Sequence, residues 1–487
     1  MTRDARACLA LFFALAFTAP SAVFGFTLSF SKTSIKTSSV PVHADLNNDG
    51  REDFVFLNLN GGFDVQLSSG DGAYASPASY TIPGGADAGL IGIADFNSDG
   101  TPDLAVFGSD HALHLFLNNG HGGFSQKATF SSGKFSEVSS LVVADFNRDG
   151  AMDLAARVST GITIVFGNGK SGFSVGPTIS TSNEGPLLLG DFDGDSNADI
   201  AISDIDNYDT LEVHYGNGKG SFPMQSLLQT SGDHFTFSAA DVNGDGKMDI
   251  IATQFYTSAH TVSVFYGSAS RTWTKSTTIP LVHCAGQSAI ATDINGDGIN
   301  DLIVAEADCN DNSQQGKAYV GVITGKGNAG FNADQIIYTG VFFLDNFTAV
   351  KAERNTKPDI TFQNCTKNPC ASSGNTDQEI LLNTTPGNFP SCAPPNAFEG
   401  INICSPAAGA TVTSPVAFAV GAAGQVVMRK VEVWADGKKL LEQLNGFSHY
   451  TFLNHSLSLA KGNHNMTIFA AGWDNSLQEK KFTLHVK

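Results

Sequence analysis

Six short acidic segments of one design, spaced at nearly regular intervals, constrain the fold more than any other feature of this sequence. They are DLNNDGRED from Asp45, DFNSDGTPD from Asp95, DFNRDGAMD from Asp145, DFDGDSNAD from Asp191, DVNGDGKMD from Asp241 and DINGDGIND from Asp293. Their first residues lie 50, 50, 46, 50 and 52 positions apart. A period in this range indicates a stacked or circular repeat, in which each unit buries its apolar face only against its neighbours.

The residues between the acidic segments predict four strands per unit and leave no room for a helix. Each segment is followed by a short apolar run, such as DLAVF or DLIVA, which is typical of a buried strand. A variable loop, a second strand such as ITIVFGNG and a glycine-rich turn follow, and a further strand leads to the next segment. The turns end in an aromatic residue at Phe124, Phe173, Phe222 and Phe331.

A seventh unit is predicted from its glycine and aromatic turn, LLNTTPGNF, which ends at Phe389. Upstream, Asp359 stands in the last position of the acidic segment, but Lys351 replaces the first aspartate, followed by Glu353 and Asn355. We interpret this as a unit that has lost its metal. Two interpretations of Lys351 stay open: its ammonium replaces the ion, or it is a solvated lysine in a degenerate loop.

Seven units of the form D-x-[DN]-x-D-G-x-x-D, each with a downstream G-x-G-x-F-like turn, resemble the FG-GAP repeats of integrin alpha-chain propellers and the related VCBS repeats of secreted bacterial proteins. The resemblance covers roughly residues 26–390. It implies an all-β fold, a seven-bladed β-propeller of four-stranded sheets around a central channel. It also suggests that FTLSFSKTSI, before the first unit, supplies the outer strand of the last blade and closes the ring.

The alternation of oxygen-bearing side chains in the acidic segments predicts a calcium loop. Ca²⁺ takes six to eight oxygen ligands, which side chains at loop positions 1, 3, 5 and 9 and the backbone carbonyl at position 7 can supply. Glycine at position 6 permits the sharp turn. An EF-hand is excluded, because position 12 lacks its glutamate in five of the loops and the flanking segments are strands.

We therefore expect about six structural Ca²⁺ ions, with affinities of roughly 10⁻⁴ to 10⁻³ M as in extracellular modules. The fourth loop departs from the pattern, because Ser196 stands where glycine is expected. The predicted ligands are Asp45, Asn47, Asp49, Arg51 and Asp53; Asp95, Asn97, Asp99, Thr101 and Asp103; Asp145, Asn147, Asp149, Ala151 and Asp153; Asp191, Asp193, Asp195, Asn197 and Asp199; Asp241, Asn243, Asp245, Lys247 and Asp249; and Asp293, Asn295, Asp297, Ile299 and Asp301, where position 7 offers its carbonyl.

The charge of the chain agrees with filled metal loops. The formal net charge is −19, and the six loops hold 19 aspartates. Six Ca²⁺ ions would bring the charge from −19 to about −7. The sequence has no basic patch to neutralise phosphate, so we expect neither nucleic acid nor an anionic membrane as a partner.

The N-terminus predicts export. Residues 1–25 read as a signal peptide, with Arg3 and Arg6 before a short apolar core, and no later segment has 18 uninterrupted apolar residues. We expect a secreted or cell-surface protein without membrane insertion. Residues 26–391 are expected to form the propeller, and residues 392–487 a second domain.

Six cysteines remain after the signal peptide, and they allow 15 disulfide connectivities. Their positions favour Cys284 with Cys309, Cys365 with Cys370, and Cys392 with Cys404. The loops between the second and third strands of each unit lengthen along the chain, and long loops on a rigid scaffold often bind ligands. The candidates for a contact surface are Asp206, Tyr208, Phe255, Tyr256 and His260.

Residues 392–487 show alternating strands and turn signals without a metal motif, and they resemble a small bacterial immunoglobulin-like sandwich. Trp434 and Trp473 are expected in its core, and the domain would serve as a spacer or a second adhesive module.

The favoured function is binding of a cell-surface glycan or protein through the propeller loops. The sequence shows no HExxH, no GxSxG in a strand-turn-helix context and no nucleotide-binding glycine loop. An extracellular polysaccharide lyase or hydrolase stays open, because a propeller can assemble a catalytic site without a linear motif. A structural surface protein is the third possibility.

Overall fold

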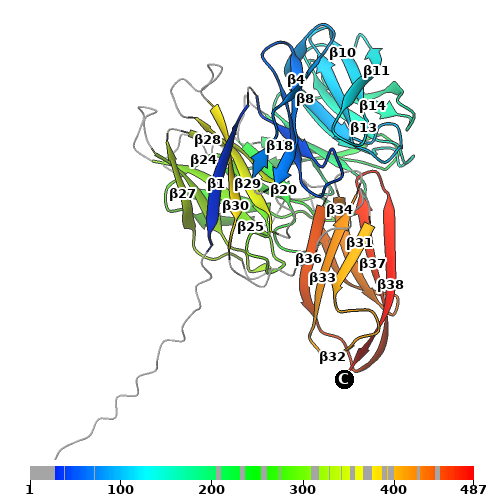
Figure 1. Cartoon of the computed structure of the whole chain (residues 1–487), viewed down its shortest axis with the longest axis vertical. Helices are drawn as coiled ribbons and strands as arrows, with labels where there is room; N and C mark the ends of the chain where they lie inside the picture. The colour runs from blue at the N-terminus through cyan, green and yellow to red at the C-terminus, as the bar shows by residue number, and fades with distance from the viewer. Residues whose placement is uncertain are drawn as a thin grey trace, which may run out of the picture.

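The chain folds into a ring of seven four-stranded antiparallel sheets followed by a two-sheet sandwich (Figure 1). The structure is a computed structural model. It describes residues 28–37, 39–70, 72–204, 210–230, 236–253, 260–273, 276–308, 317–327, 330–341, 343–350, 352, 357–365, 376–385, 392, 400–424, 428–444 and 450–487. This described part contains no α-helix, as the sequence predicts, and therefore no helix that could cross a membrane.

Each sheet of the ring is one blade, whose strands run in order from the channel outward. The first four blades are β2 (Val42–Ala44), β3 (Asp53–Leu57), β4 (Gly62–Gln66) and β7 (Ala78–Thr81); β8 (Ala86–Ala94), β9 (Asp103–Gly108), β10 (Ala112–Asn118) and β11 (Phe124–Ser131); β12 (Ser140–Ala144), β13 (Asp153–Val158), β14 (Gly161–Gly167) and β15 (Phe173–Ile179); and β16 (Leu187–Gly190), β17 (Asp199–Ser203), β18 (Thr210–Tyr215) and β19 (Met224–Gln229). A small extra hairpin joins β5 (Ser68–Gly70) to β6 (Ala73–Tyr74).

The last three blades follow the same order, and the seventh takes its outer strand from the N-terminal part of the chain. Strand β1 pairs antiparallel with β30, from Phe30 with Asn383 to Lys36 with Asp377. The ring is thus closed by the segment that the sequence marked for this purpose. These blades are β20 (Thr236–Ala240), β21 (Asp249–Thr253), β22 (Thr261–Phe265) and β23 (Ser276–Pro280); β24 (Cys284–Thr292), β25 (Asp301–Ala307), β26 (Lys317–Ile323) and β27 (Gln335–Val341); and β28 (Phe343–Val350), β29 (Asp359–Cys365), β30 (Thr376–Asn383) and β1 (Phe30–Lys36).

The propeller core lies between neighbouring blades rather than within one blade. Phe63 and Val55 of the first blade, for example, pack with Leu104 and Phe116 of the second. The second strand of each blade is almost entirely buried, as in DFVFL and DIIAT, whereas the outer strands alternate or are largely exposed. Burial on both faces explains why these strands read as continuous apolar runs.

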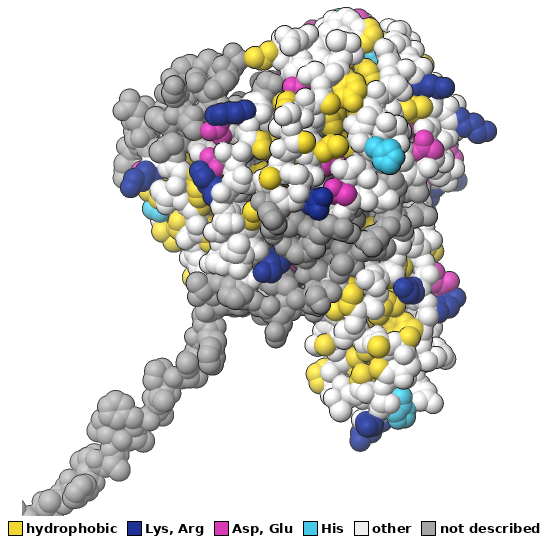
Figure 2. Space-filling view, viewed as in Figure 1, with side chains coloured by type: hydrophobic (Ala, Val, Ile, Leu, Met, Phe, Trp, Pro, Cys, Tyr) yellow, Lys and Arg dark blue, Asp and Glu magenta, His cyan; other side chains and the backbone are white. Residues whose placement is uncertain are grey.

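The C-terminal domain is a sandwich of a three-stranded and a five-stranded sheet, and it projects from the ring as a separate lobe (Figure 2). Its β34–β35 hairpin turns at Asp436 and Gly437, whose φ angles are 52° and 77°, the positive values that tight two-residue hairpins need. The strands, in sheet order, are β31 (Gly400–Ser405), β33 (Val416–Ala423) and β36 (Tyr450–Leu457); and β32 (Thr411–Val412), β38 (Leu477–Val486), β37 (Gly462–Gly472), β34 (Met428–Ala435) and β35 (Lys438–Leu444).

Candidate metal centres and the domain contact above them

The six acidic loops share one backbone turn, which the first aspartate holds in place. In every loop, Oδ2 of this aspartate accepts the backbone N–H of position 6, at 2.8 to 2.9 Å. The position-6 glycines have φ between 82° and 91°, in the left-handed region, which glycine adopts without strain. Ser196, the only exception, adopts φ 70° and therefore carries the strain that a side chain meets there.

Position 4 of each loop is also left-handed, a feature not predicted from the sequence. Asn48, Ser98 and Arg148 have φ of 59° to 60°, and glycine fills this position in the other three loops, with φ of 74° to 78°. The left-handed conformation could have been predicted from position 4 itself, which is glycine in three of the six loops and asparagine in another.

The last aspartate of each loop, at position 9, is fully buried and has a structural role of its own. In the first loop, Oδ2 of Asp53 accepts the N–H of Leu46 and Oδ1 accepts that of Ser68, at 2.9 and 2.7 Å. Both bonds recur in the other five loops. They recur in the seventh blade at Asp359, which explains why aspartate stands there although the rest of the motif has changed. The other predicted residues of that loop, Lys351, Glu353 and Asn355, lie outside the described residues.

The loop carboxylates are crowded and short of positive charge. Burial, reinforced by the neighbouring carboxylates, raises the pKa of Asp153 and Asp301 to about 8 and that of Asp103 to about 7. For the first-position acids Asp191 and Asp241, burial raises the pKa to about 6. Burial beside other carboxylates disfavours the ionised form of these groups, so a bound cation would lower the cost of ionising them.

The donor set fits a hard divalent cation. In the fourth loop, carboxylate oxygens of Asp191, Asp193 and Asp195 lie within 4.8 Å of one another, the one such acidic group among the described residues. The other loops place asparagine at position 3, where the side chain offers an amide oxygen instead of a carboxylate. Carboxylate, amide and carbonyl oxygens are the ligands that Ca²⁺ prefers.

Basic side chains already reach three of these loops. Arg271, from the fifth blade, pairs its Nε with Asp193 at 2.6 Å and its Nη2 with Asp195 at 3.6 Å. In the first and fifth loops the position-7 residues Arg51 and Lys247 pair with the position-5 aspartates of their own loops, at 2.7 and 3.1 Å. Only the fourth loop thus receives a cation from another blade among the pairs in the described part.

The C-terminal domain contacts the third and fourth loops. The backbone N–H of Asp145 donates to the carbonyl of Trp473 at 3.0 Å, and Asn475 Nδ2 donates to Asp145 Oδ2 at 3.2 Å. Arg429 Nη1 donates to the carbonyl of Ser196 at 2.6 Å. The domain therefore covers the end of the propeller that carries the metal loops.

A cavity of about 450 Å³ occupies the channel beneath this contact. Its wall is mostly apolar and comes from the innermost strands, including Ile93, Val143 and Leu189, and Trp473 lines it from the C-terminal domain. Trp473 is 2% exposed and packs with the third to fifth blades. It was expected in a core, and the core it joins is the one between the domains rather than that of the sandwich.

Trp434 was expected in the core of the sandwich, and this prediction is wrong. Val431, Val433 and Ala435 of β34 point into the sandwich, so Trp434, between the last two, points outward. The sequence KVEVWA already shows this alternation of inward and outward positions, because charged residues also occupy the outward ones.

The predicted contact surface is largely outside the described residues. Asp206, Tyr208, Phe255 and Tyr256 fall there. His260 is described, is exposed, and places its Nε2 3.8 Å from Cys284 Sγ.

The disulfide between Cys392 and Cys404 is confirmed. Cys284 is disulfide-bonded, and its predicted partner Cys309 lies outside the described residues. So does Cys370, predicted to pair with Cys365.

Comparison with protein families shows FG-GAP-like repeats at residues 45–106, 95–156 and 191–252, and a bacterial Ig domain at residues 400–468. The chain therefore contains FG-GAP-like repeats and a C-terminal bacterial Ig domain, and its fold is the propeller and sandwich that the sequence predicts. No curated protein sequence matches the chain.

Among solved structures, the BP39L lectin from Burkholderia pseudomallei is similar at 14% identity, with a TM-score of 0.51, over 72% of this chain and 97% of that one. A lectin of Agrocybe aegerita, solved for its recognition of non-reducing terminal N-acetylglucosamine, is 18% identical with a TM-score of 0.48, over 74% and 88% of the two chains. The biofilm matrix protein Bap1 of V. cholerae covers 92% of this chain at 12% identity, with a TM-score of 0.34. At 14% identity, the similarity to the BP39L lectin concerns the fold alone.

Proposed function

We propose that this protein is exported, binds Ca²⁺ in its six acidic loops, and recognises a glycan at the end of the propeller channel that faces away from the C-terminal domain. The observation that carries the proposal is the contact of Trp473, Asn475 and Arg429 with the metal-loop end of the ring. Because this contact covers the metal-loop end of the ring, we assign recognition to the opposite end of the channel.

The channel offers the mixture of surfaces that a sugar needs. Most of its wall is apolar, but His43, Thr348, Asn346 and Gln378 place polar groups on one side, at the seam between the first and seventh blades. His43 Nε2 and Thr348 Oγ1 are 3.0 Å apart, which fixes both groups. An apolar wall with a few placed polar groups is typical of sites for small organic ligands.

Two further observations support the proposal. The protein from Burkholderia pseudomallei with the same fold is named a lectin, so a propeller of this kind serves glycan recognition there. The segment expected to be a signal peptide, and the disulfide between Cys392 and Cys404, suit an extracellular protein.

A calcium titration tests the metal part of the proposal. When the free calcium concentration is ten times the dissociation constant of a site, binding at that site adds about 1.4 kcal/mol to the free energy of unfolding. We expect chelation to lower the melting temperature markedly, and a titration calorimeter to count about six sites. An unchanged melting temperature in chelator would rule out structural calcium.

A glycan array with the mature chain, in millimolar calcium and in chelator, tests the recognition part. We expect calcium-dependent retention on a defined sugar. The Gln378→Leu variant, which removes an amide from the channel, should weaken that retention. Gln66→Leu removes a buried amide outside the channel, at the first blade, and should not. Retention that neither depends on calcium nor differs between the two variants would place the site elsewhere. Absence of retention would favour a protein ligand. Cleavage of the bound sugar would make the protein an enzyme.

A further inference from the structure

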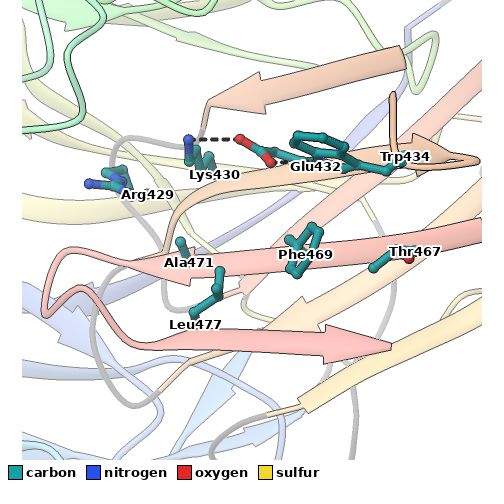
Figure 3. A pocket seen from close by; sticks show the side chains of 9 residues that line it. Arg429, Lys430, Glu432, Trp434, Thr467, Phe469, Ala471 and Leu477 are labelled. Atoms are coloured by element: carbon teal, nitrogen blue, oxygen red, sulfur yellow. Dashed lines mark hydrogen bonds and ion pairs between the residues drawn. The ribbon is translucent and has the colours of Figure 1, made fainter. Parts of the chain in front are cut away.

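The outward face of the five-stranded sheet in the C-terminal domain carries a second cavity, of about 450 Å³ (Figure 3). It is lined by residues of β34, β37 and β38 whose neighbours along each strand point into the sandwich core. Its lining comprises Arg429, Lys430, Glu432, Trp434, Gly437, Thr467, Phe469, Ala471 and Leu477. The volume lies within the range of about 300–1,000 Å³ typical of sites for small ligands.

An aromatic pair dominates this cavity. The rings of Trp434 and Phe469 lie 5.9 Å apart at an angle of 83°, so one presents its edge to the face of the other. Trp434 Nε1 donates to Glu432 Oε2 at 2.7 Å, which fixes the indole ring. Leu477, at the side of the cavity, is 63% exposed. Neither aromatic ring belongs to the hydrophobic cluster of the sandwich, so burial of that core does not account for them.

Charged groups frame the aromatic pair. Lys430 Nζ lies 2.8 Å from Glu432 and 3.3 Å from Glu442, and Lys439 approaches the same two carboxylates. Arg429 closes the end of the cavity near the propeller. Three cations thus face two anions, and the ion pairs hold Lys430 and Glu432 in fixed positions at the wall.

The charge of the whole domain has the same sign. Residues 400–487 contain eight lysines and arginines against five aspartates and glutamates, whereas the complete chain carries −19. The C-terminal domain is thus a basic module on a strongly acidic protein. An anionic ligand is favoured on this domain and disfavoured on the propeller.

We propose that this cavity binds an acidic polysaccharide, a chain of pyranose rings that carry carboxylates. The apolar face of a pyranose ring packs on Trp434 and Phe469, its hydroxyls exchange hydrogen bonds with Glu432 and Thr467, and its carboxylate pairs with Lys430. A protein partner fits less well, because a stable protein interface buries about 800 Å² on each side and this site is a small concave one. The proposal does not depend on the channel site.

Tryptophan fluorescence of the full-length protein gives a direct readout, because Trp434 is the only one of the three tryptophans that lines this cavity. The probes are short oligogalacturonates and, as matched uncharged ligands, their methyl esters. We expect the acids to change the fluorescence with saturation, and the esters to bind at least about tenfold more weakly, the effect of losing one good charge pair of about 1.4 kcal/mol.

Two variants test the assignment of the site. Trp434→Ala should abolish the fluorescence change and weaken binding at least about tenfold in calorimetry, as expected for truncation of an aromatic anchor. Lys430→Gln keeps the aromatic pair and should weaken binding of the acids while leaving that of the esters unchanged. Circular dichroism and the melting temperature serve as checks of folding.

Two outcomes would overturn the proposal. Equal affinity for acids and esters would show that charge plays no part, and unchanged binding by a folded Trp434→Ala variant would show that the ligand does not occupy this cavity. Absence of binding by any probe would likewise contradict it.

Discussion

The fourth and fifth metal loops form the same backbone turn from different sequences, and they balance their charges differently. In the fifth loop, Gly246 takes the left-handed position, and among the described residues the carboxylates have only Lys247 of the same loop as a basic partner. In the fourth loop, Ser196 takes that position, and Arg271 from the next blade binds two carboxylates. Arg429 of the C-terminal domain holds the carbonyl of Ser196.

The comparison indicates that the turn and the metal site depend on different residues. The turn depends on backbone hydrogen bonds to the first and last aspartates, which are the same in both loops. How much the loop carboxylates need a bound metal ion depends on how much positive charge nearby basic side chains already supply. The fourth loop should therefore need calcium less than the fifth.

The largest effect is expected from the aspartate at position 9, which both loops share. Asp199→Ala and Asp249→Ala each leave two buried backbone N–H groups without an acceptor. At about 1–3 kcal/mol for each unsatisfied group, we expect a loss of roughly 2–6 kcal/mol in the free energy of unfolding. Urea denaturation in chelator measures this loss without the metal.

Asp359→Ala in the seventh blade is the matched variant, because it removes the same two bonds from a loop without the first aspartate. A loss below about 1 kcal/mol in all three variants would refute the structural role assigned to position 9. A loss at Asp249 that appears only in calcium would show that this residue acts as a ligand alone.

The repeat and its loops could be predicted from the sequence because their determinants are local. The spacing of the aspartates and the glycine at position 6 recur in every blade, so one pattern predicts many turns. The contact between the domains could not be predicted, because Asn475 and Asp145 are 330 residues apart. Asparagine and aspartate are also common in turns, so neither residue signals a long-range contact. Arg271, likewise, looks like an ordinary polar turn residue until the fold brings it beside Asp193.

An acidic pair outside the metal loops, the buried Glu306 and the half-buried Asp334, serves as a control for the role of calcium. Glu306 and Asp334 each accept a backbone N–H with one oxygen, from His283 and Val282. Their other oxygens face the same point above Gly321, where a Cβ atom would lie 1.8 Å from Glu306 Oε1 and 2.7 Å from Asp334 Oδ1. Burial, together with the charge of Asp334, raises the pKa of Glu306 from 4.5 to about 8.

This pair predicts a loss of stability with rising pH. The folded state binds the proton more tightly than the unfolded state, so the stabilisation is complete below about pH 4.5 and is lost as the pH rises through about 8. Glu306→Gln keeps the shape and cannot ionise, so its free energy of unfolding should change less with pH over this interval. Urea denaturation at several pH values, in saturating calcium, measures the difference. Parallel curves for the two proteins would mean that Glu306 is not the titrating group.

Arg271→Gln should make the fourth loop resemble the fifth. Removal of the guanidinium leaves Asp193 and Asp195 free for the metal, so we expect calcium to bind this loop about tenfold more tightly, because ligand charge sets calcium affinity. In chelator, the free energy of unfolding of the variant should be lower by about 1 kcal/mol, because Asp193 is buried and loses its partner. Calorimetric titration and denaturation measure the two effects. Lys247→Gln in the fifth loop is the matched control and should change the affinity less, because Lys247 and Asp245 are both partly exposed.

The smallest effect concerns the turn itself and should have opposite signs in the two loops. Gly246→Ser introduces a Cβ atom at φ 82°, 3.0 Å from the carboxylate oxygen Oε1 of Glu442. It should lower the free energy of unfolding by about 1 kcal/mol. Ser196→Gly removes the same strain at φ 70°, but it also gives the unfolded chain more freedom, so the net gain should be about 0.5 kcal/mol. Melting temperatures of the two single variants measure the signs. If Ser196→Gly destabilises the protein as Gly246→Ser does, backbone strain does not distinguish the two loops, and the Ser196 side chain itself must stabilise the fourth one.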